Sequence, residues 1–261
     1  MQYTEIALKS FKNNLVYRAE CIGEIVNLFA VFIVNISIWR AVYQNEGDLT
    51  GVPFRMVVTY VFLAQLIFNV FAMDDFFVEK KIKSGGIAFD MLRPFNFTLY
   101  LLFYNLGILL FRIVFLFCPM LLVGWLCFHL LEPFSTTYFL YFILSVSLGY
   151  FIMYCLNYII WLCSFWIYRI FSLVTIKDTL LLILSGAVFP IWMFPDKIQE
   201  IIRFTPFEAI LYIPITIYLG QTPVDEILTN LFKQVIWLVI LFIFGQLLWK
   251  KAKKNFVVQG G

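Results

Sequence analysis

The chain has 261 residues, of which 62% are hydrophobic, 20% are aromatic and only 13% are charged. A soluble domain carries about 25% charged residues, so this composition excludes an ordinary soluble protein and indicates an all-α, polytopic membrane protein. The formal net charge is only +3, and the lysines stand in clusters beside apolar runs. This arrangement argues for membrane lipids and against nucleic acid as partners.

The first 20 residues predict an amphipathic helix that lies in the headgroup layer. Tyr3, Ala7, Phe11 and Leu15 recur every four residues, with basic and polar residues between them, which is typical of an interfacial helix. The alternative is a ragged start to the first membrane span. Charges occur throughout residues 1–20, so we do not expect a cleavable signal peptide.

A helix needs about 20 apolar residues to cross the hydrocarbon core. Stretches of about this length predict a single transmembrane domain over residues 1–261, with six spans at residues 22–43, 56–73, 106–131, 137–161, 171–193 and 231–249. The third span lies within a longer apolar stretch, 98–131, which contains Arg112 and Pro119.

Basic residues set the expected orientation, because positively charged loops stay in the cytoplasm. Alternating loops place 13 of the 19 basic residues on one side. These residues are Lys9, Lys12, Arg18, Lys80, Lys81, Lys83, Arg93, Arg169, Lys177, Lys250, Lys251, Lys253 and Lys254. We therefore expect both chain ends to be cytoplasmic, with the lysines of the last 13 residues anchored at the inner headgroups.

The expected cytoplasmic loop over residues 74–97 contains a short helix. Gly85 and Gly86 interrupt any helix that continues from the second span, and Pro94 stops the next one, so Ile87–Arg93 forms at most two turns. We expect this helix to expose Ile87, Phe89, Met91 and Leu92. A short exposed apolar helix of this kind either lies back on the membrane or fits a groove in a partner.

The segment after the fifth span is rich in proline. Prolines 190, 195, 206, 214 and 223 exclude one straight helix, and the apolar run 207–219 is too short to cross a bilayer. We therefore expect residues 194–222 to form re-entrant or interfacial helices on the outer side. Backbone of this kind is tolerated at membrane depth only where protein or a cavity covers it.

Several charged residues lie in the predicted spans, among them Arg112, Lys177 and Asp178. Arg112 lies in the third span, and it is either a residue of a gate or substrate contact or a residue at the cytoplasmic interface. We expect Lys177 and Asp178 at the inner interface, paired with other charges, and we do not expect them to bind substrate.

No cofactor site is evident in the sequence. The five cysteines form no CxxC pair and have no metal-ligand spacing, and His129, the only histidine, is expected to be structural. We therefore predict no catalytic residue, no metal site and no cofactor bound by this chain.

The order of these segments resembles a type-2 ATP-binding-cassette (ABC) transporter permease, and in particular the bacterial exporter branch of about this length. After the second span the matching residues are Gly85, Gly86, Asp90, Met91, Leu92, Arg93 and Pro94, with the methionine and leucine slightly shifted from the family pattern. In and after the fifth span they are Ser185, Gly186, Pro190, Phe194, Pro195, Pro206, Phe207, Pro214 and Gly220.

The resemblance implies that Ile87–Arg93 is a coupling helix that docks into a cytoplasmic ATPase subunit. Asp90 and Arg93 would orient the helix, and Phe89, Met91 and Leu92 would form the buried contact. The matched residues in and after the fifth span would form a re-entrant, extracytoplasmic gate.

The chain contains no G-x-x-x-x-G-K-[ST] phosphate loop, so ATP and Mg²⁺ would bind to a separate subunit. The resemblance implies two copies of this ATPase and a second permease subunit, identical or related, in a bacterial cytoplasmic (inner) membrane. The exported substrate would be a lipid, drug, peptide or glycoconjugate.

Two other function classes remain open. A secondary transporter normally shows internal repeats, and we find no convincing repeat. An intramembrane lipid-processing enzyme needs clustered acidic, histidine or cysteine residues, and the only adjacent acidic pairs in the chain are Asp74 with Asp75 and Asp225 with Glu226.

Overall fold

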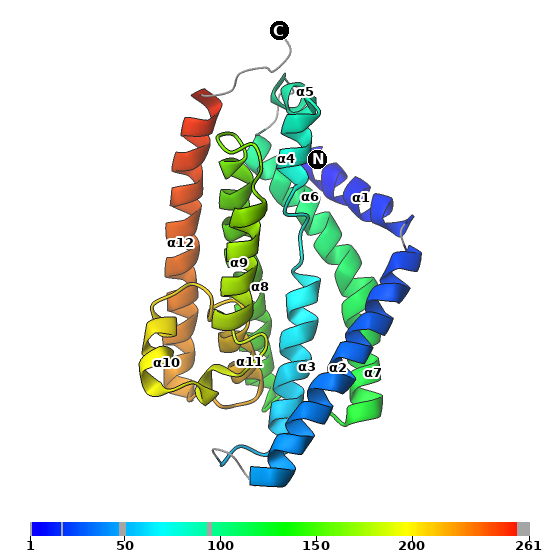
Figure 1. Ribbon diagram of the computed structural model, residues 1–261, viewed down its shortest axis with the longest axis vertical. Helices are drawn as coiled ribbons and strands as arrows, with labels where there is room; N and C mark the ends of the chain where they lie inside the picture. Colours follow the sequence, from blue (N-terminus) through cyan, green and yellow to red (C-terminus); the bar gives the residue numbers. More distant parts are fainter. Residues whose placement is uncertain (1, 17, 47–50, 93–95, 255–261) are drawn as a thin grey trace.

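The computed structural model describes residues 2–16, 18–46, 51–92 and 96–254. Within these ranges the chain is helical and contains no strand. The long helices lie side by side along the longest axis, and α1 crosses beside α6 at an angle (Figure 1). The helices are α1 Gln2–Leu15, α2 Arg18–Glu46, α3 Phe54–Val70, α4 Phe77–Lys83, α5 Gly86–Leu92, α6 Phe97–Arg112, α7 Cys118–Phe128, α8 Thr136–Cys163, α9 Phe171–Leu184, α10 Asp196–Arg203, α11 Tyr212–Tyr218 and α12 Val224–Lys254.

Four helices in the described part of the chain are long and apolar enough to cross a membrane: Ala19–Gln44, Phe97–Phe128, Thr136–Cys163 and Val224–Lys254. Helix α3 has 17 residues and α9 has 14, which at ~1.5 Å per residue gives ~26 and ~21 Å, against ~30 Å of hydrocarbon. The chain is therefore an all-helical membrane protein with four candidate spans. Six crossings remain a prediction.

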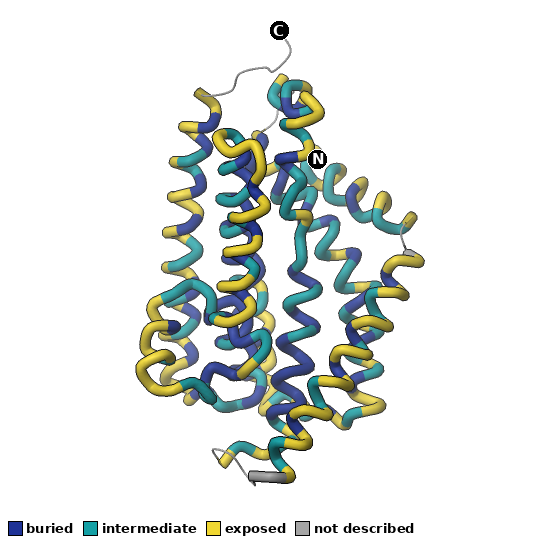
Figure 2. The backbone as a smooth tube through the Cα atoms, in the orientation of Figure 1, coloured by how far each residue is buried: buried dark blue, intermediate teal, exposed yellow. Residues whose placement is uncertain are grey.

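Burial differs between these helices. Helix α3 is buried over most of its length, whereas α2, α9 and α12 each carry many exposed residues (Figure 2). Many of these exposed residues are large and apolar. An exposed apolar stripe on a long helix is expected where lipid or another subunit covers it. Helix α3 thus lies in the interior of the bundle.

The prediction of a single helix over residues 171–193 was wrong, because α9 ends at Leu184. Gly186 adopts φ +80°, and its carbonyl accepts a hydrogen bond of 2.9 Å from the Tyr60 hydroxyl. A Cβ at this position would lie 2.3 Å from that hydroxyl oxygen, so the turn requires glycine. A short 3-10 turn, Ile191–Met193, follows.

The helix that contains most of the predicted third span, 106–131, begins at Phe97, nine residues before the start of that span. Asn96 caps it, with its side-chain oxygen accepting the N–H of Thr98 at 3.0 Å. A π-helical turn, Ile113–Phe117, joins α6 to α7. This turn precedes Pro119, which has no N–H to continue the regular α-helical pattern.

The apolar face of α1 packs against α6. Tyr3 lies beside Phe103, with ring centroids 5.4 Å apart, and the Tyr3 hydroxyl accepts the Asn96 N–H at 3.0 Å. A Cβ on Gly107 would lie 2.2 Å from the carbonyl oxygen of Ala7. Tyr3 and Ala7 on the predicted apolar face therefore contact α6 and its cap, and a position of α1 in the headgroup layer stays a prediction.

We expect Gly107→Ala to displace α1 from α6, because the added methyl group would meet rigid backbone. Hydrogen exchange of residues 2–15 should accelerate markedly. Gly23→Ala is the matched control, since a Cβ there has no neighbour within 4 Å, and this change should stabilise α2 by about 0.5–1 kcal/mol. Equal exchange in the two variants would contradict the described packing.

The segment 196–222 folds into the short helices α10 and α11. Helix α11 packs against α8 and α3, and Ile213, Ile215 and Ile217 are almost fully buried. The side chain of Gln234, on α12, donates to the Ala209 carbonyl at 2.7 Å. The apolar run 207–219 is thus covered by protein, as backbone at membrane depth requires.

Candidate functional site

Helices α4 and α5 lie at the end of the bundle where α12 finishes, opposite the end occupied by α10 and α11 (Figure 1). On α5, Phe89 is 71% exposed and Leu92 is 82% exposed, whereas Ile87 is only 3% exposed. The expectation that Ile87 would be exposed was wrong, because its side chain faces the bundle. Helix α5 therefore presents two large apolar side chains to the surroundings.

An ion pair between Asp90 and Lys81 holds α5 against α4. The Lys81 ammonium also donates to the Tyr100 hydroxyl at 3.0 Å and lies 4.8 Å from the ring centroid of Phe77. Burial lowers the pKa of Lys81, but its hydrogen bonds to Asp90 and Tyr100 outweigh burial and raise that pKa above its ordinary value. Lys81 therefore stays charged and ties α5 to α4 and α6.

The other residues predicted for the coupling site have different surroundings. Met91 is half-buried and packs against the core. Ser84 and Gly85 separate α4 from α5, and Gly86 is the first residue of α5. Arg93 and Pro94 lie outside the described residues.

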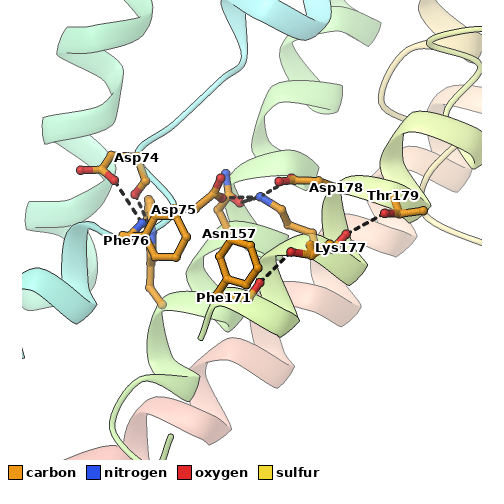
Figure 3. Close-up of polar contacts among 10 residues, drawn as sticks. Asp74, Asp75, Phe76, Asn157, Phe171, Lys177, Asp178 and Thr179 are labelled. Atoms are coloured by element: carbon orange, nitrogen blue, oxygen red, sulfur yellow. Dashed lines mark hydrogen bonds and ion pairs between the residues drawn. The ribbon is translucent and has the colours of Figure 1, made fainter. Parts of the chain in front are cut away.

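The loop between α3 and α4 connects the α4–α5 unit to α8. The Asp74 carbonyl accepts a hydrogen bond of 3.0 Å from the Trp161 indole on α8. The Asp74 carboxylate accepts the Phe76 N–H at 3.1 Å (Figure 3). It also forms an ion pair of 2.9 Å with Lys80. The base of α4 is therefore fixed to the bundle.

The next residue of this loop, Asp75, belongs to a polar cluster with Asn157, Lys177 and Asp178 (Figure 3). The Lys177 ammonium is paired with Asp75, donates to Asn157 Oδ1 at 2.6 Å and lies 3.1 Å from Asp178. The Lys177 side chain is only 6% exposed. Burial raises the pKa of Asp75, and Lys177 offsets part of this rise.

The polar cluster borders an open cavity of about 440 Å³ between α3, α8 and α9. Apolar side chains form much of the remaining wall; they include Phe68, Met73, Met153 and Leu182. The sequence predicted that Lys177 and Asp178 would pair with charges, but it could not identify Asp75 and Asn157 as partners. The only indication of this contact in the sequence was that Asp75, Asn157 and Lys177 each lie within or beside a different apolar segment.

Arg112 is paired within the protein. Its guanidinium donates to the Asn69 carbonyl at 2.6 Å and forms a bond of 3.2 Å with the Glu24 carboxylate. The residue thereby connects α6 to α3 and α2. These contacts give a structural reason for the charge, and a role in a gate stays a prediction.

The residues of the predicted gate gather around Tyr60 only in part. Gly186 accepts the hydrogen bond from Tyr60, whose ring lies 4.8 Å from that of Trp192 and 6.3 Å from that of Tyr212. The remaining members are dispersed over residues 185–220, from the end of α9 to the residues after α11. Ser185, Pro190 and Pro214 are buried, Pro206, Phe207 and Gly220 are partly buried, and Pro195 is exposed.

Within the described residues, no group of three or more His, Cys, Asp or Glu side chains is placed to hold a metal ion. The arrangement instead combines an exposed apolar helix at one end with a paired polar cluster beside a cavity. Asp74 and Asp75 connect α4 to α8 and α9 through these contacts.

Comparison with known families gives a match over residues 29–260 to the family described as ABC-2 family transporter protein. A comparison with curated proteins gave no match. The family match covers most of the chain, including all four long helices from residue 29 onward, α5 and the polar cluster. The chain belongs to the ABC-2 family of membrane transport proteins.

Proposed function

We propose that this protein is the permease subunit of an ATP-driven exporter. A separate ATPase subunit binds ATP and Mg²⁺, and α5 receives the conformational change that hydrolysis produces there. The observation that carries this proposal is the exposure of Phe89 and Leu92 on a helix that Lys81 and Asp90 fix to the bundle. A rigid apolar pair of this kind is suited to a groove in a protein partner.

The proposed complex contains two ATPase copies and a second permease subunit, the same or related. Both chain ends and α5 face the cytoplasm of a bacterium, and the α10–α11 segment lies on the outer side of its inner membrane. The exposed apolar stripes on α2, α9 and α12 are compatible with lipid or a second permease. The substrate leaves the cell and belongs among lipids, drugs, peptides and glycoconjugates.

The path from α5 into the bundle supports this function. The loop between α3 and α4 contacts α4 through Asp74 and Lys80, α8 through Trp161 and α9 through Lys177. A shift of α5 would therefore reach three helices through hydrogen-bonded and ionic contacts. In this proposal Arg112 lies on the substrate pathway, and the residues around Gly186 form the outer gate.

Purification of the tagged protein from its native host in mild detergent tests the proposal. We expect a subunit that contains a phosphate-loop sequence to co-purify, at a ratio of one ATPase per permease chain. Mass spectrometry would identify it and show whether one or two kinds of permease chain are present. If the intact permease is purified without any ATPase, in lipid that preserves such complexes, the proposed exporter function is refuted and a secondary transporter is favoured.

A further inference from the structure

The cavity beside Lys177 has the size and lining of a ligand site. Its volume of about 440 Å³ falls within the ~300–1,000 Å³ typical of small-molecule sites. Polar groups lie at one part of the wall, and Phe68, Met73 and Met153 lie at another. An amphiphile could satisfy both parts of this lining at once.

One polar group in the cavity wall has no partner. Asn157 is 1% exposed, and its Oδ1 accepts from Lys177, but its Nδ2 makes no hydrogen bond with any described residue. A buried amide donor without a partner carries a free-energy cost. An oxygen acceptor on a bound molecule would remove this cost.

The charge of the cluster excludes one class of ligand and favours another. Three acceptor oxygens, from Asp75, Asn157 and Asp178, surround the Lys177 ammonium, and an ammonium has three protons to donate. An anion would have to displace one of them. One ammonium against two carboxylates leaves the group with a net negative charge, so a cation is favoured.

We propose that this cavity is a substrate subsite for amphiphiles that carry a protonated amine beside an oxygen acceptor. The amine binds Asp178 and Asp75, the oxygen accepts from Asn157, and the alkyl part lies against Phe68 and Met153. This role for Asp178 replaces the expectation from the sequence that it does not bind substrate. The role as a transport subsite rests on the proposed function; the binding itself does not.

The position of the cavity suits this role. Lys177 is the seventh residue of α9, so it lies ~9 Å from the start of that helix. In the proposed topology this depth is near the inner headgroups, where a molecule to be exported would enter. Thr175 and Leu182 of the α9 wall are exposed, which gives access from that side.

Radiolabelled N-dodecylethanolamine is a suitable probe, because its amine and hydroxyl are two carbons apart. Binding to the full-length protein in lipid nanodiscs would be measured by scintillation proximity. We expect saturable binding, and Asp178→Asn should raise its Kd at least tenfold. Asp178 is half-exposed, so this change should leave the fold intact. Asp225→Asn is the matched control, since Asp225 is an exposed acid outside the cavity.

A ligand series tests the same point without any variant. Unlabelled N-dodecylethanolamine should displace the probe. The neutral 2-dodecyloxyethanol and the anionic dodecyl phosphate should need an at least tenfold higher concentration to displace half of the bound probe. Equal competition by either of them, or an unchanged Kd in Asp178→Asn, would overturn the proposed ligand class.

ATPase association, measured in the same protein, separates this inference from the proposed function. An ATPase that co-purifies with a protein unable to bind the amine would remove only the inference. Amine binding without any ATPase would support the cavity as a ligand site and refute the exporter.

Discussion

Replacing Phe89 and Leu92 together by aspartate is expected to separate this subunit from its ATPase and to abolish export. Burial of a Phe or Leu side chain contributes about 1.5–3 kcal/mol each, so the loss of both corresponds to about 10²–10⁴-fold in affinity. Two carboxylates in an apolar groove would weaken binding further. Co-purification of the ATPase and its substrate-stimulated hydrolysis would measure the effect.

The double variant should still insert and fold, because both side chains are exposed in the isolated chain. Phe204→Asp is the matched control. Phe204 is 83% exposed, but it follows α10 at the opposite end of the bundle (Figure 1), so its replacement should not affect the ATPase. Full association and export in the Phe89 and Leu92 variant would remove the basis for α5 as the docking helix.

Lys177→Met is expected to lower the thermal unfolding temperature strongly. The change leaves the Asp75 carboxylate and Asn157 Oδ1 without their partner in a largely buried site, and removal of one member of a buried ion pair costs about 3–5 kcal/mol. The unfolding temperature in detergent, followed by intrinsic fluorescence, would report this loss. Adding Asp75→Asn to Lys177→Met should restore part of the stability, because no carboxylate is then left unpaired there.

Lys80→Met is the control for this prediction. Lys80 forms an ion pair with Asp74, but its side chain is 67% exposed and that of Asp74 is 42% exposed. Exposed pairs contribute about 0–1 kcal/mol, so this variant should unfold near the wild-type temperature. Similar unfolding temperatures for Lys177→Met and Lys80→Met would show that the polar cluster does not stabilise the bundle.

Local features of the sequence predicted much of the helix pattern. Gly85 with Gly86 and the following apolar run predicted a short helix at 87–93, and α5 occupies 86–92. Apolar length alone located the four long helices, since a membrane-crossing helix must be apolar over about 20 residues. Helix periodicity likewise predicted α1, whose packing against α6 the periodicity did not indicate.

Other features depend on contacts between distant segments, which no local pattern contains. The end of α9 depends on the hydrogen bond between Gly186 and Tyr60, which are 126 residues apart. Ile87 was expected on the surface because apolar residues occur on every side of that short helix. Only its packing distinguishes it from Phe89 and Leu92.

Apolar length and motif spacing are local properties, and they suffice to identify an all-helical membrane protein of the ABC-2 family without a phosphate loop. The pairing of the charges, in contrast, follows from the way in which the helices pack. Lys177 contacts Asp75, 102 residues away, and Arg112 contacts Glu24, 88 residues away. Because desolvating an unpaired charge is costly, helix packing determines which charged groups are paired and which remain available to a ligand.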